Sequence, residues 1–263
     1  MRVKRLSIIL LLYVLSVPAT YAWDILGHEV VIAVAQRHLT PKTKENLAKY
    51  IAYDLKQDAV WMDDHRHDEP IAFTHNWHTC YFDDNLHYNP YYLRKTGTGD
   101  VIRALYLVES ALGNGHYKYL PDENVILSIR MLIHYVGDMH CPTHTHHNFS
   151  SAKWDCTLNG KEMTFHTVYD LMPDFLWGEM PADEIAANID DASRRERRKV
   201  ADGDLIDWAN DAAKDNIMVY RWNLPDTKIL REDTVKISKN LVNLQMRNAG
   251  YRLAYLLNQY FGK

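Results

Sequence analysis

The chain has 263 residues, of which 47% are hydrophobic and 24% are charged. Seven Trp, 17 Tyr and six Phe residues supply too much apolar surface for an intrinsically disordered protein, and 11 Gly and nine Pro residues are too few for a collagen-like or low-complexity chain. The formal net charge of −4 argues against a cationic protein that binds duplex DNA. The 14 histidines outnumber the glycines, and so much imidazole is typical of metal ligation or acid–base chemistry.

Residues 1–22 are predicted to be a secretory signal peptide. Three basic residues at the start precede the largely apolar run 6–17, which is too short to span a membrane, and the small residues Thr20 and Ala22 fit a cleavage site. A single membrane anchor is the alternative. Cleavage after Ala22 would leave residues 23–263, a mature chain that we expect to be secreted or periplasmic and not inserted in a membrane.

Apolar residues recur at helical spacing along most of the mature chain. The predicted helices span residues 24–39, 100–112, 121–140, 164–177 and 234–261, and a further helix begins at Pro41 after a Thr40 cap. No alternating pattern indicates a strand, and no repeat or low-complexity linker divides the chain. We therefore expect one all-α domain over residues 23–263.

Three cysteines allow at most one disulfide within the chain, which leaves three possible pairings. Of these, Cys141–Cys156 would close the shortest loop, and Cys80 would then stay free. The stretch Asn148-Phe149-Ser150 is a glycosylation sequon, which has meaning only in a eukaryotic source.

The segment Ser193–Lys199 is the densest basic run in the sequence. It could contact a phosphate backbone. The interpretation that we favour is a solvated helix end whose charges pair with Asp190 and Asp191.

Two His–Asp pairs share one spacing, namely His134 with Asp138 and His166 with Asp170. Residues at i and i+4 lie on one helix face, about 5–6 Å apart at Cβ, so an imidazole and a carboxylate can bind the same ion. Both pairs lie in apolar helices, where an uncompensated carboxylate is costly and a metal would compensate it. For either pair alone, an ordinary pair on a helix surface is the alternative.

Further candidate ligands surround these pairs in the sequence. His144 lies beyond Pro142, which ends or kinks the helix, so we expect it to turn toward a different ion. His28, Asp63 and His78 are weak candidates individually, because an isolated histidine is more often structural.

The candidates match, in order, the metal-binding positions of a known family. The chain resembles the zinc-dependent single-strand-specific nucleases and 3′-nucleotidases over the whole mature chain, from Trp23 to the stretch Arg252–Asn258. Nine positions carry the resemblance: Trp23, His28, Asp63, His78, His134, Asp138, His144, His166 and Asp170.

The resemblance implies a mainly helical domain, of the zinc-dependent nuclease and phospholipase C type, with three zinc ions per mature chain. It assigns Asp63, His78, His134 and Asp138 to the first ion, the backbone amine and carbonyl of Trp23 with His28 and Asp138 to the second, and His144, His166 and Asp170 to the third. It also implies two catalytic residues: Asp63, which would orient the nucleophile, and Arg66, which would stabilise the transition state. For Arg66, a surface ion pair with Asp68 or Glu69 is the alternative.

The implied activity is hydrolysis of single-stranded DNA or RNA and of 3′-nucleotides, with 5′-phosphate products and no obligate protein partner. The chain departs from the family in places: it has Cys141-Pro142-Thr143-His144 instead of Gln-Pro-Leu-His, an unusual stretch at residues 146–148, and Thr79-Cys80-Tyr81 where the family forms a base pocket. Base preference, and the balance of RNA against DNA, therefore stay open.

Two other functions remain as alternatives. A zinc phospholipase C is similar in fold and metal core, but it has a longer gap than the five residues between Trp23 and His28, and Glu at the position of Asp170. A non-catalytic exported zinc-binding protein would bind the metals without using Arg66.

Overall fold

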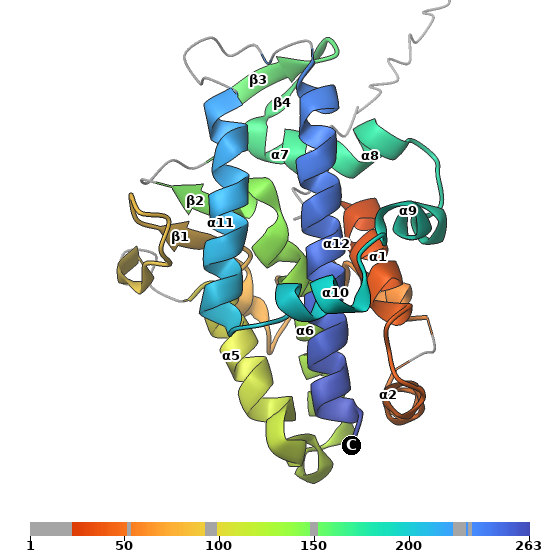
Figure 1. The fold of residues 1–263 in the computed structure, drawn as a ribbon. Coiled ribbons are helices and arrows are strands. Elements are labelled where there is room, and N and C mark those ends of the chain that lie inside the picture. Colours follow the sequence, from red (N-terminus) through yellow and green to blue (C-terminus); the bar gives the residue numbers. More distant parts are fainter. Residues whose placement is uncertain (1–22, 52–53, 93–98, 148–151, 223–229, 231–232) are drawn as a thin grey trace, which may run out of the picture.

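The computed structural model describes residues 23–51, 54–92, 99–147, 152–222, 230 and 233–263 (Figure 1). The predicted signal peptide and the sequon at Asn148 lie outside these residues. The described helices are α1 (Ile25–Gln36), α2 (Pro41–Leu47), α3 (Trp61–Asp64), α5 (Val101–Leu112), α6 (Asp122–His140), α7 (Phe165–Asp170), α8 (Met172–Trp177), α9 (Ala182–Ile189), α10 (Arg194–Val200), α11 (Leu205–Trp222) and α12 (Thr234–Phe261). The predicted all-α fold class is thereby confirmed.

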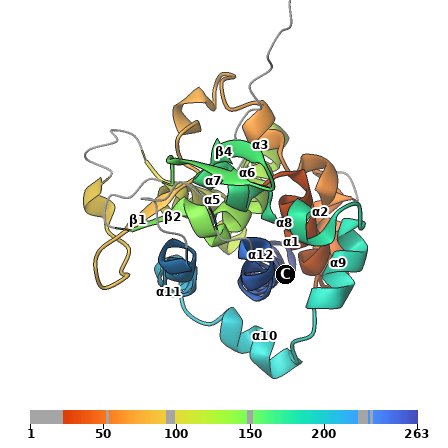
Figure 2. The ribbon, with the colours of Figure 1, turned by 90° about the horizontal axis from the view of Figure 1, so that it is seen from above.

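The long helix α12 runs through the middle of the molecule, with α1, α6, α10 and α11 arranged around it (Figures 1 and 2). It packs most extensively on α1 and α6, and α5 packs on α6. Residues such as Val34, Ile133 and Leu257 are fully buried in the resulting core. Within the described part of the chain, no helix combines the length and the apolar character that crossing a bilayer requires.

Polar caps fix where several helices begin, as the sequence indicates. The Thr40 side chain accepts a hydrogen bond from the Thr43 backbone N–H, and Pro41 occupies the first turn of α2, as predicted. Asp24 caps α1 and Asp100 caps α5 in the same way. These caps place the start of α1, and with it His28, next to the core.

The single helix predicted for residues 164–177 is wrong, because the structure has two helices there. α7 ends at Asp170, and α8 begins at Met172 with Pro173 in its first turn. Proline lacks a backbone N–H and disfavours helical geometry in the residue before it, so a continuous helix is not possible at this point. The break turns the end of α7 toward α6.

Four short strands were not expected from the sequence. They are β1 (Cys80–Phe82), β2 (Thr145–His147), β3 (Asp155–Leu158) and β4 (Lys161–Thr164). The parallel pair β1–β2 aligns Cys80 with Thr145, and β3–β4 is an antiparallel hairpin. Strands of three or four residues are too short to produce a readable alternation. The first pair brings the segment after His78 beside the segment after His144.

Two expectations about side-chain pairing are wrong. All three cysteines are free and buried, so the Cys141–Cys156 disulfide does not form. The basic run forms most of α10, but Asp190 pairs with Arg37 and His38, while Asp191 pairs with Arg247. These partners come from distant parts of the chain, which the local sequence could not indicate.

Candidate metal centre

The first cluster forms around Asp138, one helical turn after His134 on α6. Both side chains are fully buried, and His134 Nε2 lies 3.2 Å from Asp138 Oδ2. His78, which precedes β1, places its Nδ1 2.9 Å from the same oxygen and 3.1 Å from His134 Nε2. From α3, Asp63 Oδ1 lies 3.6 Å from His78 Nδ1 and 3.7 Å from His134 Nε2. The four residues assigned to the first ion therefore converge on one point.

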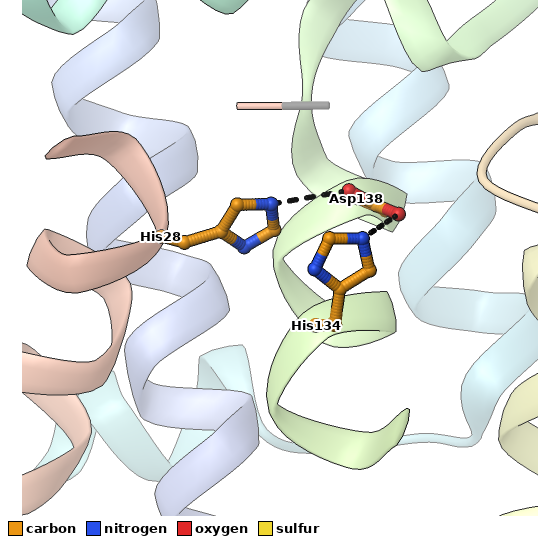
Figure 3. Close-up of side chains that lie close together, drawn as sticks. All are labelled: His28, His134 and Asp138. Atoms are coloured by element: carbon orange, nitrogen blue, oxygen red, sulfur yellow. Dashed lines mark ion pairs between the residues drawn. The ribbon is translucent and has the colours of Figure 1, made fainter. Parts of the chain in front are cut away.

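The second cluster uses the other oxygen of Asp138. His28 on α1 places its Nε2 3.4 Å from Asp138 Oδ1, and its ring stacks on that of His134 with centroids 4.4 Å apart. Figure 3 shows the carboxylate of Asp138 beside the two histidines, with one oxygen toward each ring. Trp23 lies beside this pair, because its indole Nε1 donates a hydrogen bond of 3.0 Å to the Gly137 carbonyl.

Two glycines make room for these side chains. A Cβ atom added at Gly137 would lie 2.6 Å from His28 Nδ1, and one added at Gly27 would lie 2.7 Å from the Cβ of Trp23. A Cβ added at either position would therefore displace a residue of the second cluster. Gly137 thus leaves room on α6 for the His28 ring to reach Asp138, and Gly27 leaves room on α1 for the side chain of Trp23.

The third cluster joins His144 with the pair on α7. His144 Nε2 lies 3.1 Å from His166 Nε2 and 3.6 Å from Asp170 Oδ1, and His166 Nε2 lies 3.4 Å from Asp170 Oδ2. The rings of His144 and His166 stack with centroids 4.7 Å apart. His144 thus turns away from the end of α6 toward α7, as predicted from Pro142.

Backbone carbonyls orient two of the histidines. The Ala59 carbonyl lies 3.2 Å from His134 Nδ1, and the His78 carbonyl lies 2.7 Å from His144 Nδ1. A carbonyl accepts a hydrogen bond only from a protonated ring nitrogen, so in the neutral form of each ring Nε2 is the nitrogen that carries the lone pair. That nitrogen is the one that faces the cluster.

The analysis of ligands from the sequence missed Cys141. Its buried Sγ donates a weak hydrogen bond of 3.7 Å to Asp170 Oδ1, and it groups with His144 and Asp170 at a spacing that could hold a metal. Its position three residues before His144 was the available indication. Arg66 follows α3 in a turn, is half-buried, and its backbone N–H donates to the Asp63 carbonyl at 3.4 Å.

The two aspartates of the His–Asp pairs have opposite electrostatic states. Burial disfavours the charged form of Asp138, but His134, together with the facing rings of His28 and His78, outweighs burial and lowers the pKa of this carboxyl well below its usual range. Burial likewise lowers the pKa of His134, and the charges of Asp138 and Asp63 outweigh it and raise the pKa to about 9. For Asp170, by contrast, burial and the negative charge of Asp138 together raise the pKa well above its usual range.

The donor atoms fit bound cations. Among the described residues, six buried atoms in these clusters form no hydrogen bond. Four are His28 Nε2, Asp63 Oδ2, Asp138 Oδ1 and Asp170 Oδ2, and the other two are the Nδ1 atoms of His28 and His166. Buried polar atoms without a partner are rare in proteins, and metal ligation would satisfy the first four. Imidazole and carboxylate are ligands that zinc accepts, so this donor set suits zinc.

Comparison with known proteins gives the same family along residues 23–262. The chain is 26% identical over 271 residues to nuclease PA3 of a Penicillium species and to nuclease P1 of Penicillium citrinum, covering 91% of this chain and 98% of each relative. It is 25% identical over 164 residues to nuclease S1 of Aspergillus oryzae, covering 57% of this chain and 54% of that protein. The family model described as S1/P1 nuclease matches residues 23–262, and the chain therefore belongs to the S1/P1 nuclease family.

Proposed function

We propose that this protein is a zinc-dependent hydrolase that cleaves single-stranded DNA or RNA and 3′-nucleotides and leaves 5′-phosphate products. Family membership supports phosphodiester hydrolysis. The observation that carries the proposal is the position of Asp138, whose two oxygens face different histidines, as a carboxylate shared by two ions would.

We assign nine residues to three zinc ions. They are Asp63, His78, His134 and Asp138 for the first, the Trp23 backbone with His28 and Asp138 for the second, and His144, His166 and Asp170 for the third. Zinc ions at such sites lower the pKa of a bound water and offset negative charge on phosphoryl oxygens. Cys141, which groups with His144 and Asp170, lies at the edge of the third site.

Two side chains act directly on the reacting groups in this proposal. Asp63 Oδ2 is buried and forms no hydrogen bond within the described residues, so it can accept a proton or a hydrogen bond from the attacking water. Arg66 offers a planar fork of N–H donors to the phosphoryl oxygens, where negative charge increases in the transition state. Both residues belong to the segment at and just after α3.

We also propose that the protein is exported and that removal of residues 1–22 completes the second site. The family match begins at Trp23, the residue that would be first after cleavage. In the precursor its nitrogen is an amide, whose lone pair is delocalised and binds metals poorly. After cleavage it is an amine with a reference pKa of about 7.7–8.0, which can lose its proton beside a cation.

Turnover of three substrates by the mature protein tests this function. We expect hydrolysis of a 3′-mononucleotide and of single-stranded DNA, and none of phosphatidylcholine. Turnover of phosphatidylcholine alone would indicate a zinc phospholipase C. A protein that holds zinc by elemental analysis but turns over none of the three would be a non-catalytic binding protein, and the proposal would then be wrong.

A further inference from the structure

A second feature, distant from the metal centre, is a basic groove between α10 and α12. The groove encloses a cavity of about 280 Å³. In the view from above, α10 lies on the opposite side of α12 from α6, α7 and α3, the helices that carry most of the candidate ligands (Figure 2). The residues that line the groove and matter here are Arg194, Arg197, Arg198, His38, Tyr251 and Tyr255.

Helical spacing places these side chains on two facing stripes. Arg194, Arg197 and Arg198 stand at positions i, i+3 and i+4 of α10, so they share one face of that helix. Tyr251 and Tyr255 stand one turn apart on α12 and form the opposite wall. The groove is therefore an arginine stripe facing a tyrosine stripe.

The positive charge in this groove is not neutralised by the chain. No acidic residue lines the cavity, and within the described residues neither Arg194 nor Arg198 takes part in an ion pair. Of the two carboxylates that precede α10, Asp190 contacts Arg37 and the groove residues His38 and Tyr251, and Asp191 pairs with Arg247, so neither pairs with Arg194 or Arg198. Such an arrangement leaves the two exposed guanidinium groups available for an external anion.

The middle arginine of the stripe is held in place. Arg197 Nη1 donates to the Ala192 carbonyl, and its guanidinium lies 5.9 Å from the centroid of the Tyr251 ring. Tyr255, by contrast, is 46% exposed, so one ring at the edge of the groove is open to solvent. A fixed cation, two free cations and an exposed aromatic ring lie within one cavity.

We infer that this groove binds the phosphate backbone of a single nucleic acid strand, outside the site of cleavage. Arginine forks match phosphate oxygens in geometry, and an exposed aromatic ring can stack on an unpaired base. A lipid surface would instead call for exposed apolar side chains that insert into it, and the stripe of α10 has none. That the strand is also the substrate rests on the proposed function.

The position of the groove determines which substrates it affects. Because α12 separates the groove from α6, a mononucleotide bound at the metal centre does not reach α10. A long strand that follows the surface can contact both places at once. The groove would thus increase the affinity for long strands relative to mononucleotides.

A neighbouring face of α10 provides a matched control. Arg195 and Lys199 are exposed like Arg194 and Arg198, but Lys199 lines a different cavity, whose walls include Asp191, Glu196 and Asp211. The double variant Arg194→Glu/Arg198→Glu and the control Arg195→Glu/Lys199→Glu change the net charge equally, on the same helix. Only the first removes cations from the groove.

Fluorescence anisotropy with a labelled single-stranded 30-nucleotide DNA tests the binding, in an Asp63→Asn background to limit cleavage. We expect Arg194→Glu/Arg198→Glu to weaken binding at least about fivefold and to reduce the slope of log Kd against log salt by about 1.4, as the loss of two phosphate contacts requires. The control should stay close to the parent protein. Equal affinities in the parent and both double variants would overturn the inference, and so would an equal loss of affinity in the two double variants. It would also be overturned if Arg194→Glu/Arg198→Glu lost binding to anionic phospholipid vesicles but kept its binding to DNA.

A kinetic measurement in the otherwise unaltered chain separates this inference from the proposed function. We expect the ratio of KM for the long strand to KM for a 3′-mononucleotide to rise in Arg194→Glu/Arg198→Glu and not in the control. If the protein hydrolyses neither substrate, the proposed function is wrong, and the anisotropy measurement by itself decides whether the groove binds a strand. If it hydrolyses both and the ratio is unchanged, the groove does not serve the substrate strand.

Discussion

The clusters around Asp138 and around Asp170 are built from the same parts and differ in charge. Each contains a His–Asp pair one helical turn apart and a pair of stacked histidine rings. The carboxyl of Asp138 has its pKa lowered by the histidines that face it, whereas the carboxyl of Asp170 has its pKa raised by burial and by Asp138. The same His–Asp spacing therefore gives a carboxylate whose charge is stabilised by histidines at Asp138 and one whose charge is not stabilised at Asp170.

The cause of the difference is the number of elements that meet at each aspartate. Histidines from α1, from α6 and from the segment before β1 all reach Asp138, and His134 among them has its pKa raised to about 9. At Asp170 the two neighbouring histidines stay neutral. Burial and the charge of Lys153 lower the pKa of His166 to about 4, and burial with the charge of His166 lowers the pKa of His144. The chain alone thus stabilises the charge of Asp138, while Asp170 depends on a bound cation.

Asp138→Ala is the strongest way to test this comparison. Because both oxygens of Asp138 face candidate ligands, the substitution should remove a ligand from two ions, and it should also leave a buried His134 without its main partner. We expect the loss of two zinc ions per chain and a fall in kcat/KM of about 10³-fold or more. Elemental analysis and steady-state kinetics measure the two effects.

Asp170→Ala is the matched substitution, and it should remove only the third ion. Equal zinc content in the two variants would show that Asp138 is not shared. Retention of full zinc and activity in Asp138→Ala would refute the assignment of the whole first and second clusters.

A one-residue extension before Trp23 should act on the Asp138 cluster alone. It converts the proposed amine ligand into an amide, so we expect one zinc ion fewer and turnover lowered about 10- to 100-fold, with the third ion retained. Trp23→Phe in the mature chain is the control, since it keeps the backbone amine and removes the indole that donates to Gly137. If the extended and mature chains bind equal zinc and turn over substrate equally, the amine is not a ligand.

Gly137→Ala tests whether close packing holds His28 on Asp138. The added Cβ would lie 2.6 Å from His28 Nδ1, so the ring must move and we expect turnover to fall about tenfold. Alanine stabilises a helix by about 1 kcal/mol relative to glycine, so a loss of activity could not be attributed to a weakened helix α6. Gly113→Ala, where the nearest atom would be at 3.8 Å, should leave turnover unchanged. Similar activity in both variants would contradict the packing argument.

The sequence indicates some parts of this site and not others, for physical reasons. Helical spacing alone places His134 with Asp138 and His166 with Asp170, because i and i+4 share a face whatever the tertiary fold. Nothing local brings His28, Asp63 and His78 to Asp138, since they lie 60 or more residues away along the chain. Only the family resemblance supplied those ligands.

Apart from the helix that breaks before Pro173, the errors about the fold have the same origin. The strands β1 and β2 are short and pair only because distant segments meet at the site. The partners of Asp190 include Arg37, 153 residues earlier in the chain. The Cys141–Cys156 disulfide does not form, and the spacing of the two residues in the sequence does not give the distance between them in the fold. Local patterns therefore predicted helices and their caps well, and long-range pairing poorly.

The smallest effect that we predict concerns the stability of the metal-free protein, and it has opposite signs in the two clusters. In the folded chain the pKa of Asp170 is raised, so its favourable contribution is present at low pH, where it is protonated, and is lost as the pH rises through its folded value. At pH 7 without metal, where the carboxyl of an unfolded aspartate is ionised, the raised folded pKa is therefore a penalty on folding. Asp170→Asn removes this penalty, and we expect the free energy of unfolding to rise by about 1–3 kcal/mol.

Asp138→Asn should do the reverse. The pKa of Asp138 is lowered, so its contribution is present above the unfolded value of about 3.9 and is lost in acid, and the amide would remove it at pH 7. Urea unfolding in the presence of a chelator measures both changes. The gain from Asp170→Asn should shrink as the pH falls and vanish well below about 3.9, where the wild-type carboxyl is neutral in both the folded and the unfolded state. With zinc bound, Asp170→Asn should instead be less stable than the wild type, because the carboxylate then serves as a ligand. A metal-free Asp170→Asn variant that is less stable than the wild type at pH 7 would show that Asp170 already has a compensating partner within the chain, and the contrast between the two clusters would not hold.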